Sequence, residues 1–143
     1  MNDTVNIEMR ISAPVDMVWK AWTDPDLILE WFGSDPDGKG LKAKLDVSPG
    51  GAFEISFMNS NFTEHTCSGK YLEVEPFRKL IFDWTWKSEP GVVSLVSLLL
   101  VPVDMHTMIH FEHAGVGTES AHNYKDGWTS TFQKLDRLLI APQ

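Results

Sequence analysis

The chain has 143 residues, of which 43% are hydrophobic, and its 20 acidic and 12 basic residues give a formal net charge of −8. We therefore expect a single folded domain over residues 1–143 and exclude a disordered chain. The acidic balance argues against nucleic-acid binding, because it repels phosphate backbones. No segment reaches the roughly 20 apolar residues of a membrane helix. Since the N-terminus also lacks a secretory signal, we expect no membrane insertion and a cytoplasmic location.

The first third of the chain predicts one strand and two short helices. Apolar residues alternate through residues 4–11, which is typical of a half-buried strand. Pro14 then suits the first turn of a helix, and an apolar stripe follows it at helical spacing. A second start signal at residues 23–25 predicts another short helix, which runs through Phe32 and ends at Gly33.

The rest of the chain predicts six more strands and a long final helix. The strands are expected near residues 41–47, 51–58, 65–75, 78–87, 92–101 and 105–113. Their short connections favour antiparallel hairpins. An apolar stripe predicts a helix from about Ser120 to Ile140. The fold class is therefore α+β, with a curved seven-stranded antiparallel sheet wrapped around the long C-terminal helix.

Large apolar rings are common in this chain, which has six Trp and eight Phe residues. The period of two in each strand places many of these rings on the face that turns toward the helix. Rigid rings from several elements leave gaps when they cannot interdigitate fully, so we predict a ligand pocket there. For any single residue, a plain core role is the alternative. The candidate ligand-binding residues are Trp31, Phe32, Phe53, Phe57, Trp84, Trp86, Phe111, His113, Trp128 and Phe132.

Three histidines invite a metal-site interpretation, which the predicted strand argues against. In a strand His106 and His110 share one face, whereas His113 lies on the other with Phe111, so the three cannot form one site. We therefore expect no metal, no cofactor and no catalytic residues. His113 either orients a ligand or is a buried histidine with its hydrogen bonds satisfied. Cys67 is interpreted as a buried apolar residue.

Several segments carry a resemblance to a known family. They are Ala13–Pro25, Trp31-Phe32, Asp46 with Gly50–Glu54, Gly69–Pro76, Leu80–Trp84, His113–Gly115, and Gly127-Trp128 with Leu135 and Leu138. In these the chain resembles the activator of 90-kDa heat-shock protein ATPase homologue-like family. That family lies in the START and birch-pollen-allergen superfamily (SRPBCC). The resemblance implies a helix-grip fold with a hydrophobic cavity under the long helix.

The expected function is binding of a small hydrophobic ligand, such as a lipid, a polyketide or an aromatic metabolite, between the sheet and the C-terminal helix. Two alternatives stay open: a chaperone-interacting module, and a cyclase or aromatase type of enzyme using the same cavity. The chain has no catalytic motif, which favours a protein that is not an enzyme. The segment Val92–Val101 is apolar on both faces and suggests a homodimer interface.

Overall fold

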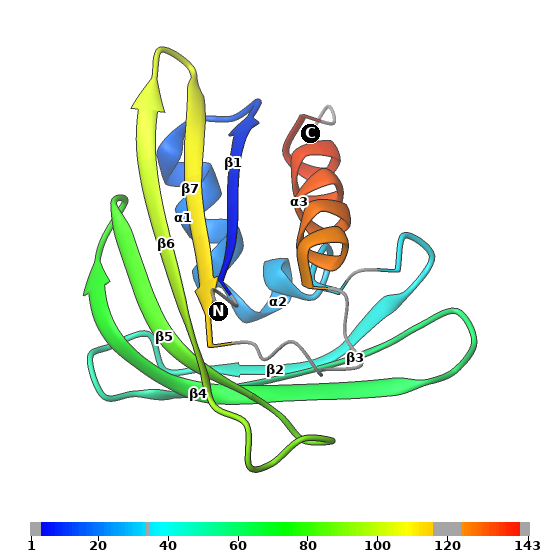
Figure 1. The fold of residues 1–143 in the computed structure, drawn as a ribbon. Helices are drawn as coiled ribbons and strands as arrows, with labels where there is room; N and C mark the ends of the chain where they lie inside the picture. The colour runs from blue at the N-terminus through cyan, green and yellow to red at the C-terminus, as the bar shows by residue number, and fades with distance from the viewer. Residues whose placement is uncertain (1–3, 34, 116–123, 141–143) are drawn as a thin grey trace.

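The computed structural model describes residues 4–33, 35–115 and 124–140, and a seven-stranded antiparallel sheet dominates it (Figure 1). The strands are β1 (Val5–Ile11), β2 (Lys39–Leu45), β3 (Ala52–Met58), β4 (Glu64–Glu75), β5 (Lys79–Trp86), β6 (Ser94–Val103) and β7 (His106–Ala114). Their order across the sheet is β1-β7-β6-β5-β4-β3-β2. The predicted α+β class is confirmed.

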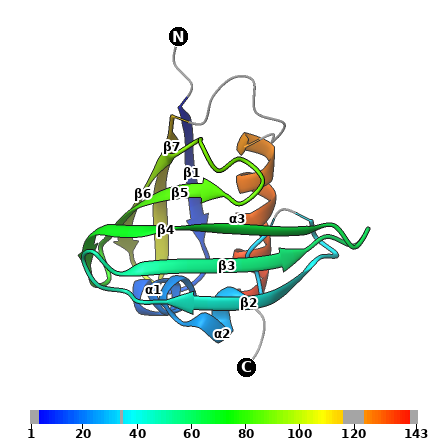
Figure 2. The same cartoon turned by 90° about the horizontal axis from the view of Figure 1, so that it is seen from below.

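Within the described residues, three helices accompany the sheet: α1 (Val15–Thr23), α2 (Pro25–Ile28) and α3 (Tyr124–Ile140). The sheet curves around α3 (Figure 1), and Figure 2 shows β2, β3 and β4 as a layer in front of that helix. This is the helix-grip arrangement. Residues 120–123 of the predicted long helix lie outside the described residues.

The prediction that the second helix runs through Phe32 is wrong, since α2 ends at Ile28. Asp24 caps this helix, because its Oδ1 accepts hydrogen bonds from the backbone N–H groups of Asp26 and Leu27. Beyond Ile28 the chain continues in tighter turns, in which the N–H of Glu30 donates to the carbonyl of Leu27.

Two irregularities accompany the bend of the sheet. The register shifts between Gly40 and Lys42 of β2, and again between Tyr71 and Glu73 of β4. Gly69 lies in β4, where it pairs with Phe53 of β3 without a shift in register. A side chain at Gly69 would collide with the backbone carbonyl of Asp83, so glycine is required there for close approach of β4 and β5.

Two sets of polar contacts hold α3 in place. The backbone N–H of Ser12, just after β1, donates to the Asp136 carboxylate at 2.7 Å. The ammonium group of Lys134 donates to the carbonyl oxygens of Gly33 at 3.1 Å and Asp35 at 3.0 Å. The helix is therefore fixed at β1 and at the loop after α2. Its nearest backbone neighbours among the described elements are β1 and α1, so side chains fill the space toward β3, β4 and β5.

Candidate functional site

The predicted ligand-binding residues meet between the sheet and α3. Nine of the ten are buried, and Trp86 at the end of β5 is half-buried. Trp128 of α3 lies at the centre of the group. Its ring centroid is 4.6 Å from that of Phe111, 5.3 Å from Trp84 and 5.9 Å from Phe32. These separations are those of tilted and edge-to-face aromatic contacts, so the rings pack on one another. Their contact with a ligand stays a prediction.

A small cavity of about 10 Å³ remains between these rings, which we call the central cavity. Its volume is about that of one water molecule, so this cavity as it stands has no room for a whole ligand. Three of the ten predicted residues line it: Phe32, Phe53 and Trp84. Its other lining residues are Trp22, Ile28, Ile55, Tyr71, Leu80 and Phe82.

Those six further lining residues were absent from the sequence-based candidates. The same periodicities could have found some of them. Ile55 alternates with Phe53 in β3, and Phe82 alternates with Trp84 in β5. Trp22 lies on the apolar stripe of α1. Which of these inward residues border a gap depends on how the rings interlock, and a period does not show that.

Trp22 and Trp84, the two tryptophans in the lining of the central cavity, have N–H groups without a partner in the described part of the chain. The indole nitrogens of Trp22 and Trp84 are buried, and neither finds a hydrogen-bond acceptor among the described residues. Trp31 differs, because its Nε1–H donates to the carbonyl of Ala21 at 3.1 Å. A buried donor without an acceptor costs about 1–3 kcal/mol of stability. Two residues of the apolar cavity lining therefore carry donors that the described part of the chain leaves unused.

His113 is the centre of a polar network, which we call the His113 centre and define as Ser94, His113, Trp128 and the carbonyl of Trp84. The indole N–H of Trp128 donates to Nδ1 of His113 at 3.0 Å, so in the neutral ring the proton is on Nε2. That Nε2–H lies 2.7 Å from Ser94 Oγ and donates to it. The Ser94 hydroxyl in turn faces the carbonyl of Trp84 at 3.4 Å.

This network holds His113 in its neutral form, and its contact with a ligand stays a prediction. Burial lowers the pKa of His113 to about 4, because the charged ring would lose its hydration. Since the ring donates to Ser94 rather than accepting from it, it is not placed to act as a base toward that hydroxyl. Both ring nitrogens have partners within the protein, which agrees with the interpretation of a satisfied histidine.

The other titratable candidates do not form a reaction centre. Cys67 is fully buried, as the sequence predicted, and burial raises the pKa of its thiol, so it stays uncharged. His110 faces outward, where its Nδ1 lies 3.3 Å from the Glu8 carboxylate. His106 is half-buried rather than fully solvated. No three His, Cys, Asp or Glu side chains in the described ranges are grouped to hold a metal ion.

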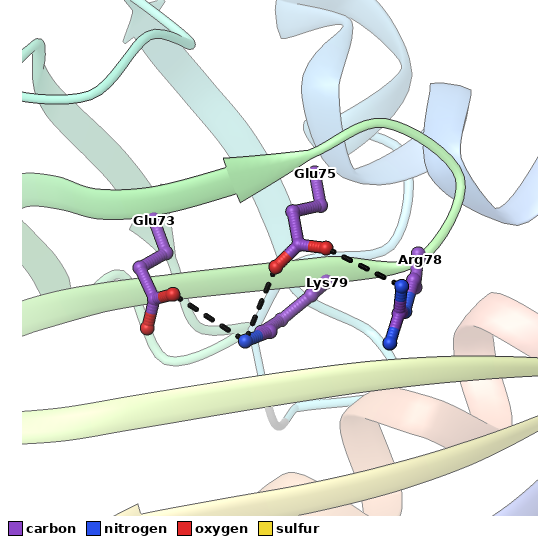
Figure 3. Close-up of polar contacts among 4 residues, drawn as sticks. All are labelled: Glu73, Glu75, Arg78 and Lys79. Atoms are coloured by element: carbon purple, nitrogen blue, oxygen red, sulfur yellow. Dashed lines mark hydrogen bonds and ion pairs between the residues drawn. The ribbon is translucent and has the colours of Figure 1, made fainter.

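The turn between β4 and β5 carries the charged cluster drawn in Figure 3. Lys79 lies 3.1 Å from the Glu75 carboxylate and 3.3 Å from Glu73, and these hydrogen bonds raise the pKa of the lysine. Glu75 also faces Arg78 at 3.7 Å. The charges compensate one another in solvent, so the cluster has the character of an ordinary surface network.

The outer face of β6 is apolar and exposed. Leu95, Leu99 and Val101 point away from α3 with more than a third of their surface in solvent, as the sequence suggested. Pairing of two copies through this face stays a prediction. Among the described helices, none has the length and apolarity needed to cross a bilayer.

Comparison with known proteins places the chain in a family. The family model described as "Activator of Hsp90 ATPase homolog 1-like protein" matches residues 12–140. CalU16 from Micromonospora echinospora is 31% identical with a TM-score of 0.72, and the match covers 97% of this chain and 76% of that protein. No curated protein matches the sequence.

Two further solved structures share the fold at lower identity. CV1439 from Chromobacterium violaceum has a TM-score of 0.84 at 19% identity, covering 98% of this chain and 99% of that one. DynU16, described as a protein in the dynemicin biosynthetic locus, has a TM-score of 0.79 at 24% identity, covering 97% of this chain and 48% of that one. The chain belongs to the Activator of Hsp90 ATPase homolog 1-like family.

Proposed function

We propose that this protein binds a small hydrophobic molecule between its sheet and α3. The observation that carries the proposal is the central cavity. Its lining residues are almost entirely apolar and aromatic. Binding would draw on apolar burial at about 25 cal/mol per Å², so a ligand that buries about 300 Å² gains roughly 7 kcal/mol before the costs of association. The ligand classes expected from the sequence are lipids, polyketides and aromatic metabolites.

Admitting a ligand requires the interior to widen, and the fold offers a place for this. Between α3 and β3–β5 the layer consists of side chains, whereas the backbone of α3 is fixed at β1 and at the loop after α2. Rings such as Phe32 and Phe53, which line the cavity and have no hydrogen-bonding groups, can turn or shift without breaking backbone hydrogen bonds. Widening on the β3–β5 side therefore leaves the ladder of the sheet intact.

The enzyme alternative needs an inner titratable group, and the interior offers few. His113 is neutral with both nitrogens engaged, and burial raises the pKa of Tyr71 as it does that of Cys67. These environments favour binding over acid–base chemistry. The chaperone-interacting alternative rests on the family resemblance. DynU16, a protein of the same fold, belongs to a biosynthetic locus, which is compatible with a role toward small molecules.

The test is native mass spectrometry of the gently purified protein, followed by identification of any molecule released on denaturation and titration with indane. Binding of a hydrophobic molecule is the expected result. Ile55→Trp fills the central cavity and should abolish binding of the hydrophobic molecule. Glu54→Trp puts the same side chain on the outer face of the same strand and should leave binding unchanged. The proposal would be contradicted if the purified protein released no hydrophobic molecule and also failed to bind indane. Equal loss of binding in both variants would contradict it as well.

A further inference from the structure

We infer that the ligand of the proposed site carries a neutral acceptor oxygen, such as the oxygen of a ketone. This oxygen accepts hydrogen bonds from the indole N–H groups of Trp22 and Trp84 at the central cavity. The inference rests on the proposed function and adds the chemical class of the ligand. It starts from the two buried indoles that have no acceptor among the described residues.

Among the described residues, both buried indoles without an acceptor border the central cavity, and the other buried side-chain nitrogen without a partner, Nδ1 of His106, is not part of its lining. Both Trp22 and Trp84 border the central cavity, and each is only 2% exposed. The paired indoles Trp31 and Trp128 are absent from that lining and donate to Ala21 and His113. Neighbouring rings contact Trp22 and Trp84 edge to face, and a ring face is a weaker acceptor than an oxygen. The two indole N–H groups are therefore available for an oxygen brought by a ligand.

The size of the central cavity fits this assignment. A space of about 10 Å³ accommodates one oxygen-sized group, and the rest of the ligand would lie where the rings shift apart. A hydrocarbon alone would leave both indole N–H groups without a partner.

The charge of the oxygen follows from the same lining. Neither lysine nor arginine is among the residues at the central cavity, so an ionised carboxylate there would lie in an apolar interior without a counter-charge. The lysine that anchors α3, Lys134, already donates to the carbonyls of Gly33 and Asp35. A ketone, ester or amide oxygen fits the site, and a free fatty acid does not.

The test compares three probes that share one ring system: indane, indanone and indane carboxylate. Proton–nitrogen NMR resolves the indole N–H signals, which single Trp→Phe variants assign. Without a ligand, the signals of Trp22 and Trp84 should lie upfield of those of Trp31 and Trp128, because the latter are hydrogen-bonded. Indanone should move the Trp22 and Trp84 signals downfield and bind about tenfold more tightly than indane or the carboxylate.

Matched variants separate the inference from the proposed function. Trp22→Phe and Trp84→Phe should remove the preference for indanone over indane, whereas Trp31→Phe makes the same volume change and should keep it. Equal binding of indanone and indane without a downfield shift would overturn the inference and leave the proposed function standing. Signals that are already downfield without ligand, and that indanone does not move, would assign the cavity to water and overturn the inference as well. Failure of all three probes to bind would overturn the proposed function itself.

Discussion

The His113 centre and the central cavity lie in the same aromatic interior, yet they differ in whether their polar groups have hydrogen-bond partners. At the His113 centre every ring nitrogen has a partner, from Trp128 through His113 to Ser94. At the central cavity the N–H groups of Trp22 and Trp84 have none among the described residues. The chain thus completes one polar network internally and leaves the other open. We take this difference to separate the part of the interior that holds the fold together from the part available to a ligand.

The largest expected effect comes from the ring that touches both regions. Phe132 is fully buried, with its centroid 6.1 Å from that of Trp22 and 5.7 Å from that of Trp128. Phe132→Ala should lower the free energy of unfolding by about 3–5 kcal/mol, because it removes the ring and leaves a cavity. Urea denaturation measures this. The control Phe77→Ala truncates a ring that is 51% exposed and should cost less than about 1 kcal/mol. Equal costs would contradict the packing described here.

Acid should weaken the His113 centre specifically. The unfolded chain takes up a proton on this histidine near its ordinary pKa of 6.5, whereas the folded protein resists it until about 4. Between these two pKa values the unfolded state therefore binds more protons than the folded state. The free energy of unfolding should fall by about 3 kcal/mol as the pH drops from 6.5 to about 4. Denaturation of wild type and His113→Gln at several pH values isolates the effect. The variant should lose this part of the slope, and identical slopes would refute the assignment.

A matched series of Trp→Phe variants compares the two regions directly, since each variant removes the same volume. Trp31→Phe and Trp128→Phe break hydrogen bonds to Ala21 and His113, whereas Trp22→Phe and Trp84→Phe break none in the described structure. The first two should therefore lose about 1–2 kcal/mol more stability than the second two. Chemical denaturation of the four variants measures this, and a uniform loss would remove the distinction between the regions.

The smallest effect is expected outside both regions, at the charged turn of Figure 3. Lys79→Met removes ion pairs to Glu73 and Glu75 that lie in solvent. Its urea denaturation curve should overlay that of wild type, because exposed ion pairs contribute little to stability, and probe binding should stay as in wild type. A loss of probe affinity in this variant would mean that the site extends to the surface of β4 and β5.

The alternation of residues was sufficient to predict which faces of the strands turn inward. It placed Phe53 and Phe57 together in β3, and it separated His113 from His110 in β7, as the structure confirms. It could not predict that Ser94 would be a partner of His113, because that contact depends on how β5, β6 and β7 align. The end of α2 was also missed, because Trp31 and Phe32 keep the spacing of a helix and are buried, although the residues after Ile28 form turns.

The central cavity was harder to predict than the fold. Periodicity identifies inward rings, but the volume left between them depends on side-chain angles and centroid distances, such as the 5.2 Å between Phe53 and Phe82. The unpaired indoles of Trp22 and Trp84 likewise become visible only when the position of every nearby acceptor is known.

A crystal structure of the protein with bromoindanone bound, in which the anomalous signal of bromine locates the probe, tests the central claim most directly. We expect a bromine peak between the sheet and α3, with the probe within about 4 Å of the rings of Phe53, Phe82 or Trp84 and its oxygen facing the indoles of the central cavity. Probe bound only on the outer face of the sheet, or an interior unchanged at saturating concentration, would contradict a ligand site in this interior.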